Sequence, residues 1–127
     1  MTAWTRCLTL CVILLVGLTA CARGSDGVIL DFFHAIERGD QDAAVALFSP
    51  DIQEKFNADE LHAAVQRWAH DMQAHRGLKD IEVQGGVVTY NRLALYDVTL
   101  IYGDGARKML QTSTVHVEGV WYINAAL

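Results

Sequence analysis

The sequence predicts an α+β domain in which helices come first in the chain and pack on one antiparallel sheet. Apolar residues recur at helical spacing up to about residue 76, whereas from Lys79 they alternate with a period of two. The predicted strands follow one another through short, mostly glycine-containing turns, which join antiparallel neighbours. The 127 residues are enough for one compact domain behind a targeting segment.

The first two helices are separated by a glycine. Ser25 or Asp26 can cap a first helix whose apolar stripe consists of Ile29, Phe32, Phe33 and Ile36. Gly39 ends this helix, and Asp40 caps the next one directly. The second helix is short, because Ser49-Pro50 interrupts it, and its inward-facing residues are Ala43, Ala44, Leu47 and Phe48.

A longer third helix is expected after a further turn. Pro50 suits the first position of a helical turn that covers Asp51 to Phe56. Asn57 or Asp59 then caps the third helix, which ends at Gly77. Its apolar stripe comprises Leu61, Val65, Trp68 and Met72. Because this stripe must close over the sheet, we expect Trp68 to be buried.

Four strands follow, joined as a meander. The first starts at Lys79 and contains a bulge at Gly85-Gly86, and the others are expected at 93–102, 107–117 and 120–125. The connecting turns are Asn91-Arg92, Gly103-Asp104-Gly105 and Glu118-Gly119. The strand at 93–102 is largely apolar on both faces, although helices can cover only one of them. We therefore expect the other face to be covered by a curled sheet or by a second subunit.

The composition excludes several classes of protein. The formal net charge is −5, with 10 Lys and Arg against 15 Asp and Glu, and no basic stripe is present to meet phosphates. Nucleic-acid binding is therefore not expected. The composition also does not fit collagen, a disordered chain or a disulfide scaffold.

The amino terminus predicts export and lipid attachment. Arg6 precedes residues 7–20, which carry no charge and are too few to span a bilayer, for which about 20 apolar residues are needed. Leu18-Thr19-Ala20-Cys21 resembles the lipobox of bacterial lipoproteins. The resemblance implies that residues 1–20 are a signal peptide and that Cys21 receives acyl chains such as palmitate. An ordinary signal peptide with a cysteine at its cleavage site, or an uncleaved anchor, is the alternative.

Lipidation at this position divides the chain into three parts. Residues 21–27 become the lipidated cysteine and a short tether, and residues 28–127 form the domain. Cys7 and Cys11 lie in the removed segment, so no disulfide can form in the mature chain. We expect a membrane-anchored protein of the bacterial cell envelope. Ala22 is not the Asp that resembles an inner-membrane retention signal in enteric bacteria, which favours the outer membrane, facing the periplasm.

Four motifs together resemble the nuclear transport factor 2-like superfamily. They are Phe32-Phe33-x-Ala35 with Gly39-Asp40, then Leu47-Phe48-Ser49-Pro50, Tyr102-Gly103-Asp104-Gly105 and Trp121-x-Ile123. The resemblance covers residues 27–125 and is strongest for a branch of small bacterial lipoproteins with a domain of uncharacterised function. It implies a cone in which three N-terminal helices pack on a curved four-stranded antiparallel sheet, with a cavity between them. The final hairpin is shorter than is usual, which leaves open the face that Trp121 occupies.

The candidate binding residues lie on the predicted strands. His116 should lie directly across the last hairpin from Trp121. Asp97 stands among apolar neighbours on the central strand, next to Tyr96, where a buried carboxylate would have a raised pKa. His34 and His70 are expected to face solvent. His62, His70 and His75 do not share a helix face at i, i+4 spacing, so we predict no metal site and no cofactor.

Two functions of different classes remain open. The first is a non-catalytic module of the envelope that binds a small apolar ligand or an envelope protein, through the four candidates Tyr96, Asp97, His116 and Trp121. In the second, Asp97 and His116 act as a proton-transfer pair in a small cofactor-free isomerase or lyase. We favour the first, with no catalytic residue assigned, because no convergent catalytic set is visible. A homodimer through the uncovered sheet face is expected in either case.

Overall fold

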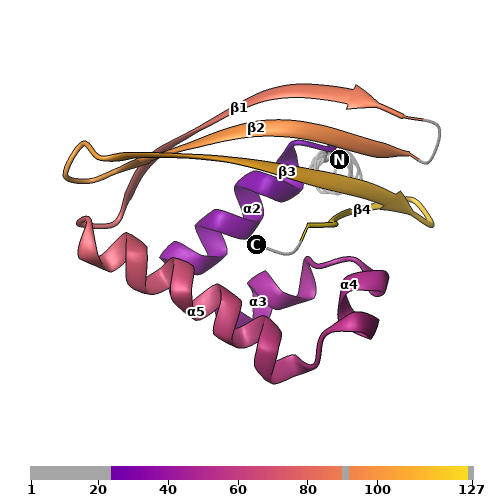
Figure 1. Ribbon diagram of the computed structural model, residues 1–127, viewed down its shortest axis with the longest axis horizontal. Coiled ribbons are helices and arrows are strands. Elements are labelled where there is room, and N and C mark those ends of the chain that lie inside the picture. Colours follow the sequence, from indigo (N-terminus) through magenta and orange to yellow (C-terminus); the bar gives the residue numbers. More distant parts are fainter. Residues whose placement is uncertain (1–23, 90–91, 126–127) are drawn as a thin grey trace, which may run out of the picture.

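The computed structural model describes residues 24–89 and 92–125, in which helices cover one face of a single bowed sheet (Figure 1). The helices are α2 (Gly27–Glu37), α3 (Gln41–Ala46), α4 (Pro50–Lys55) and α5 (Ala58–Ala74). The strands are β1 (Leu78–Val88), β2 (Leu93–Tyr102), β3 (Arg107–Val117) and β4 (Val120–Ile123). The α+β prediction is confirmed. Three predicted features lie outside the described residues: the signal peptide, Cys21 and Asn91 of the first strand turn. Among the described residues, no helix is long and apolar enough to cross a membrane.

The described part of the chain contains four helices, one more than the predicted three. The additional one is α4, which we expected only as a turn. It forms because the Ser49 hydroxyl accepts the backbone N–H of Ile52 and Pro50 occupies the first helical position. At the start of α5, Asn57 and Glu60 form a reciprocal capping box.

The sheet is a meander in the order β1-β2-β3-β4, as predicted. The pairing of β1 with β2 shifts between Gly85 and Val87, so the expected bulge is present. Both glycines of this bulge have positive φ values, which L side chains rarely adopt. The extra residue turns Val87 away from the side of Ile81 and Val83, and it lies opposite Leu95 on the outer face, where its exposed fraction is 73%.

The core lies between the inner face of the sheet and the helices. The inner residues of β2 are all buried: Ala94, Tyr96, Val98, Leu100 and Tyr102. Trp68 is only partly buried, which corrects our expectation. Its ring packs edge-to-face on Phe33 at 5.5 Å between ring centroids, while its other side borders a hollow between α5 and β3.

The last strand ends at Ile123, two residues earlier than predicted. Beyond that point the backbone leaves the hairpin to pair with the linker between α3 and α4. Ile123 donates its N–H to the Leu47 carbonyl, and its own carbonyl accepts from Ser49, both at 2.8 Å. The Ser49 hydroxyl also donates to the Asn124 side chain at 2.7 Å. These bonds fix the helical layer to the end of the sheet.

Candidate functional site

Two of the predicted binding residues, Tyr96 and Asp97, lie on opposite faces of β2. Tyr96 faces inward and is 7% exposed, and its hydroxyl forms a hydrogen bond with the Ser25 hydroxyl. Asp97 is exposed on the outer face, where its carboxylate accepts a hydrogen bond from Gln111 at 3.0 Å. Asp97 is therefore not buried among its apolar neighbours, because alternation along the strand turns it away from the helices.

The other two, His116 and Trp121, form the predicted cross-strand pair. Their ring centroids are 4.9 Å apart, and Arg92 lies 3.2 Å from the Nδ1 of His116. Both are two residues from the buried Thr114–Ile123 pair, which places them on the inner face. Asp97 and His116 thus project from opposite faces of the sheet. They do not converge on one cavity.

An apolar hollow lies elsewhere, between α4 and α5. We call it the α4–α5 pocket; its volume is about 370 Å³ and its lining residues are Phe48, Ile52, Phe56, Glu60, Leu61, Ala63, Ala64 and Arg67. This volume is near the lower end of the range of about 300–1,000 Å³ that is typical of small-molecule sites. None of the four predicted binding residues lines it.

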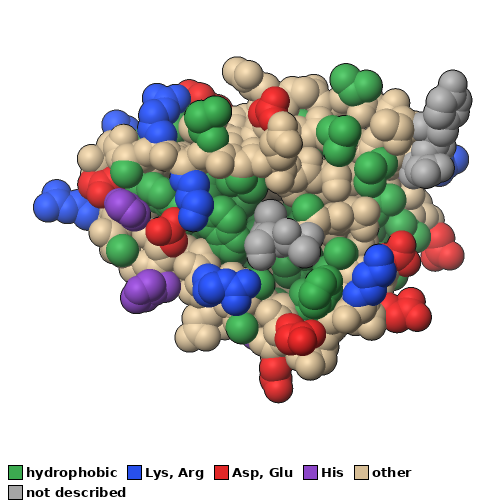
Figure 2. Space-filling view, viewed as in Figure 1, with side chains coloured by type: hydrophobic (Ala, Val, Ile, Leu, Met, Phe, Trp, Pro, Cys, Tyr) green, Lys and Arg blue, Asp and Glu red, His purple; other side chains and the backbone are tan. Residues whose placement is uncertain are grey.

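A second hollow, the α5–β3 cleft, lies between the same helix, α5, and strand β3. It has a volume of about 260 Å³ and is lined by Arg67, Trp68 and Asp71 of α5 and by Lys108 of β3. The Lys108 ammonium lies 4.6 Å from the centroid of the Trp68 ring, a cation–π contact. Figure 2 shows basic side chains beside hydrophobic ones between the sheet and the helices on this face.

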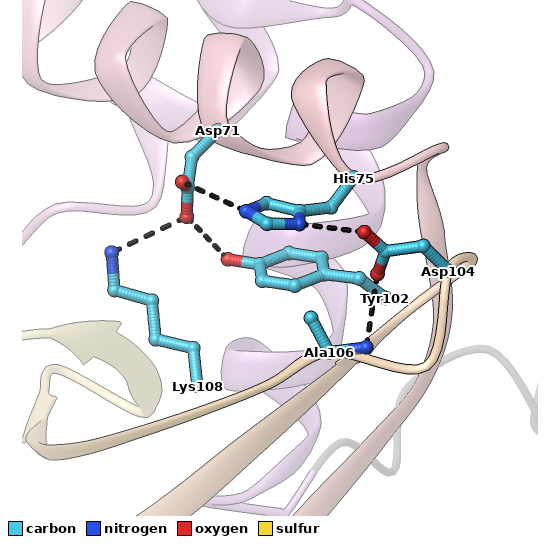
Figure 3. A network of polar contacts seen from close by, with 6 residues as sticks. All are labelled: Asp71, His75, Tyr102, Asp104, Ala106 and Lys108. Atoms are coloured by element: carbon cyan, nitrogen blue, oxygen red, sulfur yellow. Dashed lines mark hydrogen bonds and ion pairs between the residues drawn. The ribbon is translucent and has the colours of Figure 1, made fainter.

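Beyond the cleft, a polar network joins the end of α5 to the β2–β3 hairpin (Figure 3). The Asp71 carboxylate accepts hydrogen bonds from the Tyr102 hydroxyl at 2.6 Å and from Lys108 at 3.3 Å. The His75 ring stacks on Tyr102 and lies between two carboxylates, 2.8 Å from Asp104 through Nδ1 and 4.0 Å from Asp71 through Nε2. The network therefore connects four charged or titratable side chains around one buried phenol.

The electrostatics of this network oppose proton transfer. The hydrogen bond from Tyr102 holds the pKa of Asp71 below its usual value, and the N–H of Ala106 together with His75 lowers the pKa of Asp104. Burial raises the pKa of Tyr102, and its bond to Asp71 raises it further. Both carboxylates are thus weak bases and the phenol is a weak acid. This arrangement suits a structural connection better than general acid–base catalysis.

The sequence contained one signal for this network that our reasoning missed. Asp71 and His75 are spaced i, i+4, which places them on one face of α5, but our reasoning weighed the histidines and acidic residues of this helix only as metal ligands. Within residues 24–89 and 92–125 no group of three or more His, Cys, Asp or Glu side chains could hold a metal ion. Nothing in the sequence placed Arg67 or Lys108 beside a pocket, since they come together only where α5 and β3 border the same cleft.

Comparison with known proteins identifies the fold. No protein-family model matches the sequence, and neither does any curated protein. Among solved structures, the chain resembles a candidate nuclear transport factor 2-like transpeptidase from Campylobacter jejuni with a TM-score of 0.62 and 15% identity, over 75% of this chain and 92% of that one. It also resembles a SEC-C motif containing protein from Rhodopseudomonas palustris with a TM-score of 0.56 and 16% identity, over 85% and 83%. The domain therefore has a nuclear transport factor 2-like fold, which by itself does not determine function.

Proposed function

We propose that this protein is a membrane-anchored lipoprotein of the bacterial envelope whose domain binds a small apolar ligand without catalysis. The observation that carries the proposal is the α4–α5 pocket. Six of its eight lining residues are apolar, and Phe48, Ile52 and Leu61 are themselves buried in the core. Such a pocket, apolar with few polar groups, is the usual form of a small-molecule site.

The arrangement of the polar groups favours binding over catalysis. The proton-transfer pair of the alternative function, Asp97 and His116, lies on two faces of the sheet. The carboxylates nearest the pockets are engaged as well, since Asp71 accepts two hydrogen bonds and Glu60 caps α5. No group in the α4–α5 pocket pairs a nucleophile with a base.

Lipid attachment at Cys21 would hold this domain close to the membrane. Ser25 lies four residues after Cys21 in the sequence, and four extended residues span at most about 14 Å. The Ser25 hydroxyl is already bonded to Tyr96, and α2 begins at Gly27. In the proposed tether of residues 21–27, the last residues would thus already contact the domain. Several acyl chains would make the anchoring stable.

Mass spectrometry of the intact protein tests the anchoring. Material extracted from membranes should consist of a chain that starts at Cys21 and carries added acyl mass. The Cys21→Ala variant should yield no lipidated product. A mature chain that starts elsewhere and lacks lipid would contradict this part of the proposal.

Titration with octanol tests the binding function. The lipidated chain in bilayer nanodiscs should respond with saturable amide shifts along α5 in NMR spectra. Ala64→Phe should abolish these shifts because the new ring fills the pocket, whereas Ala46→Phe, on the exposed end of α3, should not. An unchanged thermal unfolding transition shows that Ala64→Phe still folds. If octanol and its charged eight-carbon analogues all fail to cause a saturable shift in the unaltered chain, the proposed function is wrong.

We also propose that two copies associate through the outer face of the sheet. Four large apolar side chains are exposed there: Val87, Leu95, Met109 and Val120. Exposed apolar residues grouped on one face are typical of an interaction surface. A second copy would cover them without competing for the α4–α5 pocket, which lies on the opposite side of the sheet.

A further inference from the structure

Arg67 occupies an unusual position on α5, because it borders three neighbouring hollows. It lines the α4–α5 pocket, the α5–β3 cleft and a shallower hollow that also contains His70 and Lys108. The Arg67 side chain has no hydrogen-bond or ion-pair partner within the part of the chain that the structure describes. Arg38 and Arg107, by contrast, lie 3.7 and 3.2 Å from carboxylates. Among the described residues, Arg67 is therefore a cation that no carboxylate engages.

The acidic residue of the same pocket does not neutralise this charge. Glu60 directs its Oε2 to the backbone N–H of Asn57 at 2.9 Å, so its carboxylate is held at the amino terminus of α5. A helix amino terminus favours negative charge, which keeps Glu60 in this position. Lys108 lines the neighbouring α5–β3 cleft and not the pocket, and its charge is paired with Asp71 at 3.3 Å. Of the two charged residues that line the pocket, Arg67 is thus the one that no carboxylate of the described residues engages, and the other six lining residues are apolar.

We infer that the ligand is an anionic amphiphile with a single short apolar chain. The chain would occupy the α4–α5 pocket against Phe48, Ile52 and Phe56, and its head group would contact the Arg67 guanidinium, which also lines the pocket. Guanidinium binds both carboxylate and phosphate in a bidentate manner. The volume of about 370 Å³ suits one short chain rather than a lipid with two. This inference rests on the proposed function and adds the charge of the ligand to it.

Four probes with the same eight-carbon chain test the inference. Octanoate and octyl phosphate carry an anionic head, octanol is neutral and octylammonium is cationic. Each is titrated into the lipidated chain in nanodiscs, and dissociation constants are read from the amide shifts of α5. Each probe partitions into the bilayer to the same extent for every variant. The quantity compared between variants is therefore the dissociation constant of octanol divided by that of octanoate.

In the unaltered chain we expect this ratio to be about fivefold higher than in Arg67→Gln, the upper end of the effect of an exposed ion pair. Arg67→Lys keeps the positive charge, so its ratio should lie between those of the unaltered chain and Arg67→Gln. The matched control Lys55→Gln removes a cation from exposed α4 that does not line the pocket, and it should leave the ratio unchanged. Salt should weaken octanoate binding and leave octanol binding unaffected. The tighter of the two anions identifies the head group as carboxylate or phosphate.

The inference fails if Arg67→Gln leaves the ratio as it is in the unaltered chain, or if octylammonium binds as tightly as octanoate. Octanol binding that Ala64→Phe abolishes would then still support an apolar site. If none of the four probes binds, the proposed function fails with it. The two failures are thus distinguishable.

Discussion

The two faces of β2 are built from similarly apolar residues but have different surroundings. On the inner face, Val98 and Leu100 are at most 1% exposed, because α2 and α5 lie against them. On the outer face of the same strand, Leu95 is 54% exposed and Asp97 lies beside it in solvent. A strand that is apolar on both faces thus indicates burial of both faces, and the helices bury only one of them. The outer face keeps its apolar residues for a partner, as we propose.

The largest expected effect of this difference is on stability. Leu100→Ala should lower the free energy of unfolding by about 2–5 kcal/mol, because it leaves a cavity in a closed core. Leu95→Ala removes the same atoms from the outer face and should cost under about 1 kcal/mol. Urea unfolding followed by near-ultraviolet circular dichroism measures both. Equal losses would mean that the outer face is as closely packed as the inner one.

Trp68 tests a position between these extremes. Trp68→Ala should destabilise by about 2–3 kcal/mol, less than the roughly 3–5 kcal/mol of a fully buried tryptophan, since only one side of its ring packs on Phe33. His70→Ala, on the exposed side of α5, should change stability little. The same urea titration compares them. A loss for Trp68→Ala no larger than for His70→Ala would contradict the packing on Phe33.

The polar network should contribute less, and in a pH-dependent way. Tyr102→Phe removes the hydrogen bond to Asp71 and should cost about 1 kcal/mol at neutral pH, since Lys108 and water still satisfy the carboxylate. Because the folded state lowers the pKa of Asp71, its contribution is present above the unfolded value of about 3.9 and is lost as the pH falls below it.

Thermal unfolding between pH 7 and 2 measures this dependence. The difference in stability between Tyr102→Phe and the unaltered chain should shrink as the pH falls below about 4. Lys108→Gln is the control: it should have a smaller effect at pH 7, because Lys108 and Asp71 form a partly exposed ion pair. A constant difference at all pH values would show that the hydroxyl stabilises the fold independently of the charge on Asp71.

Local chemistry made most of the fold predictable. The bounds of β2 and β3 agree with the sequence, since glycine-containing turns and a period of two mark both ends. The helix caps at Asp40 and Asn57 follow from the same kind of local signal. The fourth helix was missed because six residues after a proline fit a turn equally well. Its local signal, Ser49-Pro50, indicates where a helical turn begins but not how many residues follow in the helix.

The candidate site was less predictable because it depends on tertiary contacts. Tyr102 and Asp71 are 31 residues apart in sequence, and their bond arises only when β2 packs beneath α5. The α4–α5 pocket likewise forms where Phe48 of the linker between α3 and α4 approaches Arg67 of α5. His116 and Trp121 were placed correctly, since a two-residue turn fixes the register across a hairpin. Sequence reasoning succeeded where one turn determines the contact.

The smallest effect on unfolding is expected at the outer face, where the effect on association should be decisive. Leu95→Glu changes a side chain that already contacts water, so it should alter the stability of the folded subunit by no more than about 0.5 kcal/mol. It would, however, place a carboxylate in the middle of the proposed dimer contact, where burying an unpaired charge is costly. Sedimentation equilibrium in density-matched detergent should give a dimer for the unaltered chain and a monomer for Leu95→Glu. The control Gln73→Glu adds the same charge at an exposed position of α5 and should remain dimeric. If the unaltered chain sediments as a monomer, these apolar residues lack the proposed partner.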